Sequence, residues 1–146
     1  MENNKFFSVI VNAVVTKEGK VLLSQRSFEE SYEPGKWTIP GGKVENPINE
    51  KDNINIIEKT LAKEVKAAVG VDITENVVLI SNNSFKKENG QTELSLVFLC
   101  EYKEGKAVPL ENKINVAWVK SSELENFNFP QNIKSYIEKG FNLLNI

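Results

Sequence analysis

GKWTIPGGKVENPINEKDNINIIEKTLAKEVKAAVGV, residues 35–71, is the stretch that decides the fold. Its first part ends in Gly41 and Gly42, and paired glycines permit a positive φ or a close approach of the backbone to another group. Its second part has the three- and four-residue apolar spacing of a helix that buries one face. The apolar positions are Ile54, Ile57, Leu61, Val65, Ala68 and Val69. We expect a helix over Ile54–Val69, with the two glycines packed against its start.

Both ends of this helix carry residues that favour a helix boundary. Asp52, Asn53 and Asn55 can each supply an N-cap side chain. Asn55 and Glu58 have the spacing of a capping box. At the other end, a glycine at position 70 is well suited to the residue that follows a helix.

The rest of the chain alternates between strand-like segments and turns, and it ends in a second amphipathic helix. The expected strands are Ser8–Val15, Val21–Gln25, Val77–Ile80, Thr92–Tyr102 and Asn115–Val119. Asn89-Gly90 indicates a hairpin turn, and the polar residues Asn46–Asn53 indicate a surface loop. The last helix is expected over Gln131–Leu144, with Pro130 at its first position. Strands interleaved with two helices predict an α/β fold with a mixed sheet between helical layers.

Length and composition narrow the range of functions. A chain of 146 residues corresponds to a single domain, residues 1–146, and its net charge of −2 does not favour binding to duplex nucleic acid. We expect no membrane span and no cleaved leader. The lone Cys100 allows no internal disulfide and is expected to be a buried structural thiol, which indicates a cytoplasmic protein. The absence of histidine excludes Ser-His-Asp and Cys-His catalysis and leaves acid–base chemistry to carboxylates, lysines or tyrosines.

The stretch from residue 42 to residue 71 resembles the signature of the Nudix hydrolase family, G-x5-E-x7-R-E-U-x-E-E-x-G-U, where U is aliphatic. Gly42 matches the first glycine, Lys63-Glu64-Val65 matches R-E-U, and Gly70-Val71 closes the pattern. The neighbouring segments are also similar to those of the family. They are SVIVNAVV, VLLSQRS and EPGKWTIPGGKVE before the helix and VAWVKSSEL near the end of the chain. The resemblance covers roughly residues 7–137 and implies the Nudix α/β/α sandwich.

The signature is degenerate in this chain. Its two adjacent glutamates fall on Ala67 and Ala68, and its arginine is Lys63. The two glycines lie 28 positions apart instead of 21, so about seven residues are inserted. The isolated glutamate of the signature falls on Ile48 when counted from the front and on Asn55 when counted from the back.

The resemblance implies Mg²⁺-dependent cleavage of a nucleoside diphosphate linked to another group. Glutamates three and four positions apart on one helix can share a metal ion, but only Glu64 remains of that set, as ligand or catalytic group. Glu45 and Glu93 are the other candidate metal ligands in our assignment, and Glu50, Asp52 and Glu58 are further nearby carboxylates. Arg26, the only arginine, either holds a phosphate or pairs with an acid as a structural residue. Gly41 and Gly42 complete the candidate substrate-binding residues.

Two functions remain open at this point. One is a Nudix-type hydrolase with a weakened or rebuilt metal site, and the other is a non-catalytic Nudix module that binds or senses a nucleotide. A protein-interaction domain is a third alternative. The expected partner is a small nucleotide or diphosphate ligand, and a homodimer is a candidate assembly. Because Ala67 and Ala68 supply no side-chain oxygen, we expect weak binding of Mg²⁺ to the free protein.

Overall fold

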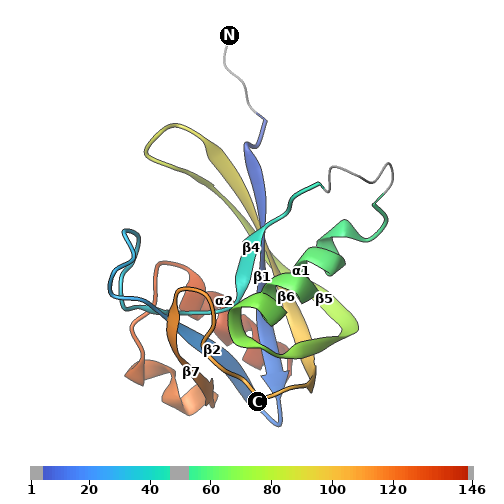
Figure 1. Cartoon of the computed structure of the whole chain (residues 1–146), viewed down its shortest axis with the longest axis vertical. Coiled ribbons are helices and arrows are strands. Elements are labelled where there is room, and N and C mark those ends of the chain that lie inside the picture. The colour runs from blue at the N-terminus through green and yellow to red at the C-terminus, as the bar shows by residue number, and fades with distance from the viewer. Residues whose placement is uncertain (1–4, 47–52, 145–146) are drawn as a thin grey trace.

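A seven-stranded mixed sheet forms the centre of the part of the chain that the computed structural model describes, residues 5–46 and 53–144 (Figure 1). Strand neighbours follow the order β3-β2-β1-β6-β5, while β4 pairs with β1 and β7 pairs with β2. The strands β1 and β6 are parallel, and the other pairs are antiparallel. The strands are β1 (Ser8–Lys17), β2 (Lys20–Arg26), β3 (Trp37–Thr38), β4 (Gly41–Lys43), β5 (Asp72–Lys86), β6 (Thr92–Glu104) and β7 (Lys113–Val119).

Two helices cover opposite faces of this sheet. In Figure 1, α1 (Ile56–Val69) lies in front of the sheet and α2 (Ile133–Leu143) lies behind it. A short 3₁₀ helix, η1 (Ser121–Asn126), connects β7 to the segment that leads into α2. The expected α/β/α sandwich is therefore confirmed. Neither helix has the length and apolar character needed to cross a membrane.

Alternation along the strands supplies two separate cores. On β1, Val11, Ala13 and Val15 join the cluster under α1, whereas Val14 joins the cluster under α2. On β6, Phe98 and Cys100 face α1, and Val97 faces α2. Each fully buried aliphatic side chain contributes roughly 1.5–3 kcal/mol relative to an exposed one. Cys100 is 1% exposed, and burial raises the pKa of its thiol to about 12, so the prediction of an unreactive structural thiol fits its surroundings.

The starts of both helices differ from the sequence-based expectation. Helix α1 begins at Ile56, and Asn55 before it has a left-handed backbone (φ 62°) with no side-chain capping bond, so the predicted capping box is wrong. A capping side chain normally sits on an extended backbone, which this conformation excludes. Helix α2 begins at Ile133 after Asn132 with φ 75°, so the prediction of Pro130 at its first position is also wrong. Asp52 and Glu50 lie outside the described residues.

Strand β5 is much longer than the expected Val77–Ile80. It pairs with β6 from Asp72 to Lys86 and has register shifts at three places. It is an edge strand with many polar side chains, so its outer parts have no apolar run that sequence reasoning could use. The predicted turn at Asn89-Gly90 does connect β5 to β6, and Gly90 has a φ of 88°.

The packing of α2 on the sheet depends on Gly140. A Cβ atom at this position would lie 2.9 Å from Cγ1 of Val14. Replacing glycine by alanine inside a helix usually stabilises it by about 1 kcal/mol, but overpacking costs roughly 1–3 kcal/mol. We therefore expect Gly140→Ala to lower Tm by about 2–5 °C in thermal melts.

A double-mutant cycle checks this explanation. Val14→Ala removes the methyl groups that the new Cβ would meet, so Gly140→Ala should cost less stability in the Val14→Ala background than in the wild type. Equal costs in the two backgrounds would contradict the steric explanation.

Candidate functional site

The site is built around the contact between Gly42 on β4 and Glu64 on α1. A Cβ atom at position 42 would lie 2.6 Å from both Cδ and Oε2 of Glu64 and 2.9 Å from Cγ. The absence of a side chain at position 42 therefore lets the Glu64 carboxyl group lie directly on the β4 backbone. Gly42 contributes close approach and not a positive φ, and it meets the third turn of α1 instead of its start, which corrects the sequence-based expectation.

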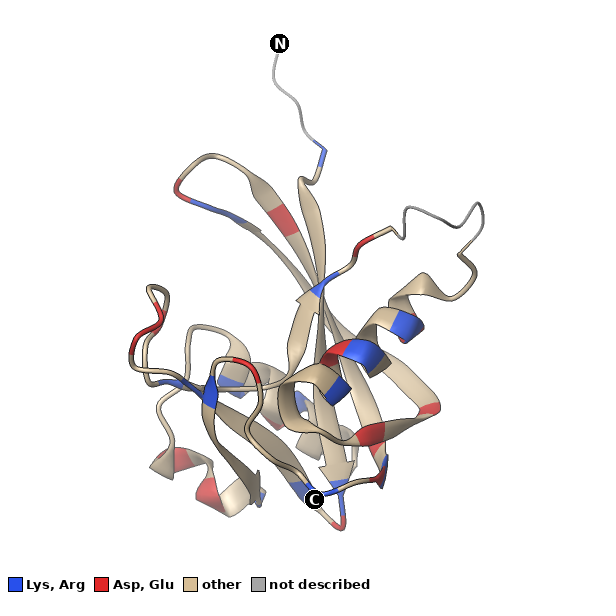
Figure 2. Ribbon diagram, viewed as in Figure 1, with Lys and Arg blue, Asp and Glu red and all other residues tan. Residues whose placement is uncertain are grey.

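A pocket of about 300 Å³ opens beside this contact. It is lined by Lys43, Glu45, Thr60, Lys63 and Glu64. Thr60 is 7% exposed and donates its hydroxyl hydrogen to the carbonyl oxygen of Ile56, at 2.7 Å, so its side chain has a fixed position. The two ammonium groups and two carboxylates give the pocket mixed charge, and Figure 2 shows basic and acidic segments side by side on α1. Such a pocket can attract phosphate oxygens and also accept protons or cations.

The surroundings of Glu64 disfavour its charged form. Partial burial is the largest cause and raises the pKa of the Glu64 carboxyl group, and the negative charge of Glu111 raises it further. The ammonium group of Lys63 lowers this pKa, and the charge of Glu45 raises it again. The pKa of Glu64 is raised as the result of these effects. The carboxyl groups of Glu45 and Glu111, which come from two other segments, therefore both lie close enough to Glu64 to affect its charge.

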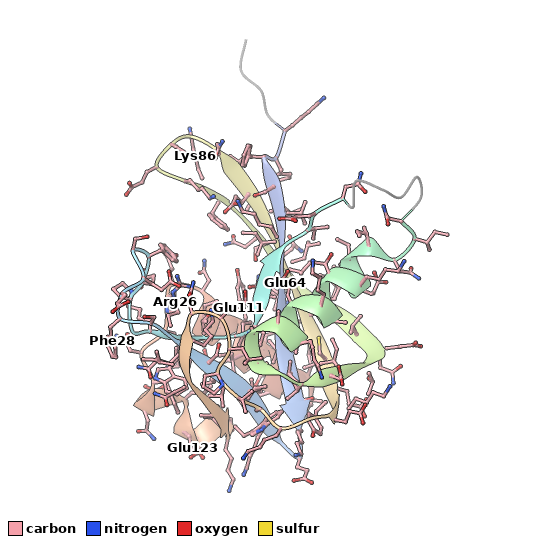
Figure 3. The ribbon with its side chains drawn as sticks, viewed as in Figure 1. Arg26, Phe28, Glu64, Lys86, Glu111 and Glu123 are labelled. Carbon is pink, nitrogen blue, oxygen red and sulfur yellow. The ribbon has the colours of Figure 1, made fainter. Side chains whose placement is uncertain are left out.

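Glu111 is the member of this group that sequence reasoning missed. It belongs to the segment between β6 and β7, and Figure 3 shows this loop beside the end of α1. The backbone N–H of Val108 donates to the carbonyl of Val69 at 3.0 Å, and that of Leu110 donates to Ala68 at 3.1 Å. These bonds tie the loop to the last turn of the helix and place Glu111 near Glu64. Nothing in the local sequence around Glu111 has motif-like spacing, so only the fold identifies it.

The structure places the other candidates differently. Glu45 is exposed and lines the pocket, and Gly41 pairs with Asn12 on β1, next to Gly42. Glu58 is exposed on α1 and does not line the pocket. Glu93 is 2% exposed at the start of β6, where Ser8 and Lys87 are its partners, and it does not line the pocket.

Arg26 is engaged with the loop that follows β2. Its Nε donates to the carbonyl oxygen of Tyr32 at 3.0 Å, and its guanidinium lies 5.5 Å from the centroid of the Tyr32 ring. One terminal nitrogen is 3.8 Å from the carboxylate of Glu30. These contacts are those expected of a structural arginine that pairs with an acid. Binding of a phosphate by Arg26 stays a prediction.

The two alanines of the degenerate signature lie in different environments. Ala67 is exposed on α1, three positions after Glu64, and therefore on the same side of the helix. Ala68 is only 4% exposed and belongs to the core under α1. The burial of Ala68 agrees with its place in the apolar spacing of the helix, so Ala67 is the position of the two that lies on the surface beside Glu64.

These residues do not make a preformed Mg²⁺ site. Carboxylate oxygens are the right kind of ligand, but within residues 5–46 and 53–144 no three acidic or cysteine side chains lie close enough together to hold a metal ion. Glu64 is the carboxylate fixed at the centre, while Glu45 is exposed and Glu111 acts on Glu64 through its charge. Among the described residues, a divalent cation here would find too few oxygen ligands and would need others, such as those of a bound molecule.

Comparison with known proteins identifies the family. A family model described as NUDIX domain matches residues 6–139. The chain belongs to the Nudix family. Nucleoside triphosphatase NudI of Klebsiella pneumoniae (strain 342) is 28% identical over 131 residues, which cover 81% of this chain and 85% of that protein.

Solved structures share this Nudix fold. The MutT protein from Methanosarcina mazei Go1 superposes with a TM-score of 0.72 and 23% identity, covering 99% of both chains. The NUDIX domain of Shewanella oneidensis NrtR, solved in complex with ADP ribose, gives a TM-score of 0.70 at 18% identity. That match covers 93% of this chain and 87% of the other. At these identities the structural matches establish the fold.

The raised pKa of Glu64 predicts how its removal affects stability. Because this pKa is raised in the folded state, the folded protein binds the proton more tightly, and ionised Glu64 destabilises the fold as pH rises through that pKa. Glu64→Gln should therefore raise Tm by roughly 1–3 °C at pH 7.5. The difference should shrink as the pH falls below about 4.3, because the carboxyl group then becomes protonated in the unfolded state as well.

Glu58→Gln is the matched control for this measurement. It removes a charge from an exposed position in the first turn of the same helix, where negative charge is favourable, so Tm should stay unchanged or fall. A lower Tm for Glu64→Gln at pH 7.5 would contradict the destabilising role of the ionised carboxylate.

Proposed function

We propose that this Nudix domain is a weak diphosphohydrolase that acts on a nucleoside diphosphate linked to another group, including nucleoside triphosphates. The observation that carries the proposal is the Glu64 carboxyl group held on the Gly42 backbone beside Lys43 and Lys63. The family assignment and the NudI relative support this class of reaction. The alanines at positions 67 and 68 support a low rate.

The charges of the site suggest that the nucleotide enters as its Mg²⁺ complex. Two lysines line the pocket, but Glu45 and Glu64 line it too, and Glu111 adds a third negative charge nearby. A polyphosphate without a cation would meet this excess of negative charge. We therefore treat Mg²⁺ as part of the substrate, with the phosphates supplying the ligands that the protein does not.

The residues of the pocket can each be given a part in the reaction. Lys43 and Lys63 attract the phosphate oxygens and hold the diphosphate across the pocket. A water molecule attacks one phosphorus, so a new P–O bond forms while the bridging P–O bond breaks, and the leaving phosphate takes the electron pair. Glu64 accepts the proton of the attacking water, and its raised pKa brings it closer to the pH at which a general base is most effective.

The alternative is a Nudix module that binds a nucleotide without cleaving it. It is favoured by the absence of side-chain oxygens at positions 67 and 68 and by the ADP ribose complex of the NrtR NUDIX domain. A hydrolysis screen separates the two functions. Nucleoside triphosphates and ADP ribose are incubated with Mg²⁺ or Mn²⁺, and thermal shifts are measured with and without the cation.

In this screen, the first proposal predicts slow Mg²⁺-dependent turnover and a thermal shift that requires nucleotide and cation together. A thermal shift without turnover would establish the binding module. Tight binding of Mg²⁺ to the free protein would show that the carboxylates form a complete metal site. The absence of both turnover and a thermal shift would reject both functions.

Ala67→Glu tests whether missing carboxylates limit the rate. The new carboxylate would lie on the same side of α1 as Glu64, so we expect Mg²⁺-dependent turnover to rise by about tenfold or more, which corresponds to roughly 1.4 kcal/mol or more of transition-state stabilisation. Ala62→Glu is the matched control, because it adds the same charge at an exposed position that does not face Glu64. Equal rates for both variants and the wild type would contradict this explanation.

Ala68→Glu is expected to behave differently. It would place a carboxylate in the core under α1, where an unpaired charge is costly, so this variant should unfold at a much lower temperature than Ala67→Glu.

A further inference from the structure

A partly buried polar cluster on the other face of the sheet has no role in the site described above. It consists of Ser8 and Asn12 on β1 and Glu93 and Ser95 on β6. By strand alternation these side chains share the face of Val14 and Val97, which pack under α2. Glu93 is 2% exposed and Ser95 is 5% exposed. Buried carboxylates are rare unless they are paired, and a sheet needs none on an inner face, so this cluster requires an explanation.

Within residues 5–46 and 53–144, the contacts of Glu93 use one of its two carboxylate oxygens. The Ser8 hydroxyl donates a hydrogen bond to Oε2, and the ammonium of Lys87 lies 3.3 Å from the same atom. No group in the described part of the chain makes a hydrogen bond or an ion pair with Oε1. Lys87, on the hairpin between β5 and β6, is 35% exposed in its side chain, so the flexible group that contacts Glu93 also reaches solvent.

Asn12 also leaves an acceptor unused. Its Nδ2 donates to Oγ of Ser95 at 2.8 Å, which fixes the orientation of the amide group. Its Oδ1 accepts no hydrogen bond from the described residues, and a Cβ atom at position 41 would lie 2.8 Å from it. The absence of a side chain at position 41 therefore lets the Gly41 backbone lie close to this oxygen. Together, Asn12 and Glu93 present two acceptors on the same face.

The position of the cluster connects it to the diphosphate site. Gly41 pairs with Asn12, and Gly42, the next residue, carries the contact with Glu64 on the opposite face. From Asn12 to Ser8, which pairs with Glu93, the strand covers about 13 Å at roughly 3.3 Å per residue. This length is comparable to that of a nucleoside. In Figure 1, the start of β1 and the β5–β6 hairpin extend past the ends of both helices.

We propose that Glu93 is a specificity-determining residue that accepts a hydrogen bond from the exocyclic amino group of the substrate's nucleobase. This inference rests on the proposed function and names the class of base. A carboxylate has acceptors only, and so has the free oxygen of Asn12, so the complementary base edge is one that donates N–H groups. Guanine, adenine and cytosine carry such an amino group, whereas uracil and hypoxanthine do not.

Matched nucleotide pairs test this proposal directly. GTP carries an amino group that ITP lacks. CTP carries an amino group where UTP has a carbonyl oxygen. Dissociation constants of all four are measured with the full chain in the presence of Mg²⁺. The wild type should bind the amino-bearing member of each pair at least about tenfold more tightly, because a base without the donor displaces water from the carboxylate and makes no hydrogen bond in its place.

Glu93→Gln should reduce this preference to less than about threefold, since its amide also donates hydrogen bonds. Glu88→Gln removes the same charge from the exposed hairpin turn and should keep the wild-type preference. Lys87→Met removes the ammonium but leaves the carboxylate, so the preference should persist. If Glu93→Gln does not fold, Glu93→Asp keeps the charge on a shorter side chain, and it should weaken the preference.

The outcomes separate this proposal from the function on which it rests. A wild type that binds all four nucleotides equally overturns the role of Glu93 and leaves nucleotide binding intact. A Glu93→Gln or Glu93→Asp variant that loses affinity for all four nucleotides equally also overturns it, because that result indicates a structural role. A wild type that binds none of them rejects the proposed function itself.

Discussion

The close approach of the β4 backbone to helix α1 is the constraint on which the site depends. At position 42 even a methyl group would occupy space that the Glu64 carboxyl group fills. The strand β4 has only three residues, yet it pairs with the central strand β1 and so holds Gly42 in a fixed place. The helix is held from below by Leu61 and Val65 in the core. The carboxyl group is therefore positioned by two elements that are themselves anchored in the sheet.

The degenerate signature changes the chemistry of this site without weakening the fold. Alanine has the highest helix propensity, and Ala68 fills part of the core under α1. The carboxylates that remain come from separate segments, which are the end of β4, the helix and the loop before β7. Burial is the main cause of the raised pKa of Glu64, and the charges of Glu111 and Glu45 add to it, but the three carboxylates do not gather into a metal cluster within the described residues. This arrangement explains why the supply of oxygen ligands by a bound nucleotide is central to the proposed function.

Sequence reasoning succeeded where apolar periodicity was strong. The three- and four-residue spacing located α1 to within two residues at its start, and β-branched runs located β1, β2, β6 and β7. It failed where the backbone conformation overrode a side-chain preference, as at Asn55 and Asn132, which both adopt a left-handed conformation. Sequence reasoning also underestimated the length of β5, because pairing with β6 extends that strand over polar residues whose sequence does not by itself predict a strand.

The sequence by itself determined the family and the mixed sheet covered by helices on both faces, and it pointed to Gly42 and Glu64 as candidate site residues, because these depend on local spacing and on glycine's missing side chain. Only the tertiary structure decided which carboxylates meet. Glu111 reaches Glu64 through backbone hydrogen bonds between segments about 40 residues apart, and Glu93 is buried beside Ser8, 85 positions earlier in the chain. Contacts between distant segments depend on the order of the strands and on how loops pack against helices. Both are set only when the whole sheet assembles, so no local sequence pattern predicts these contacts.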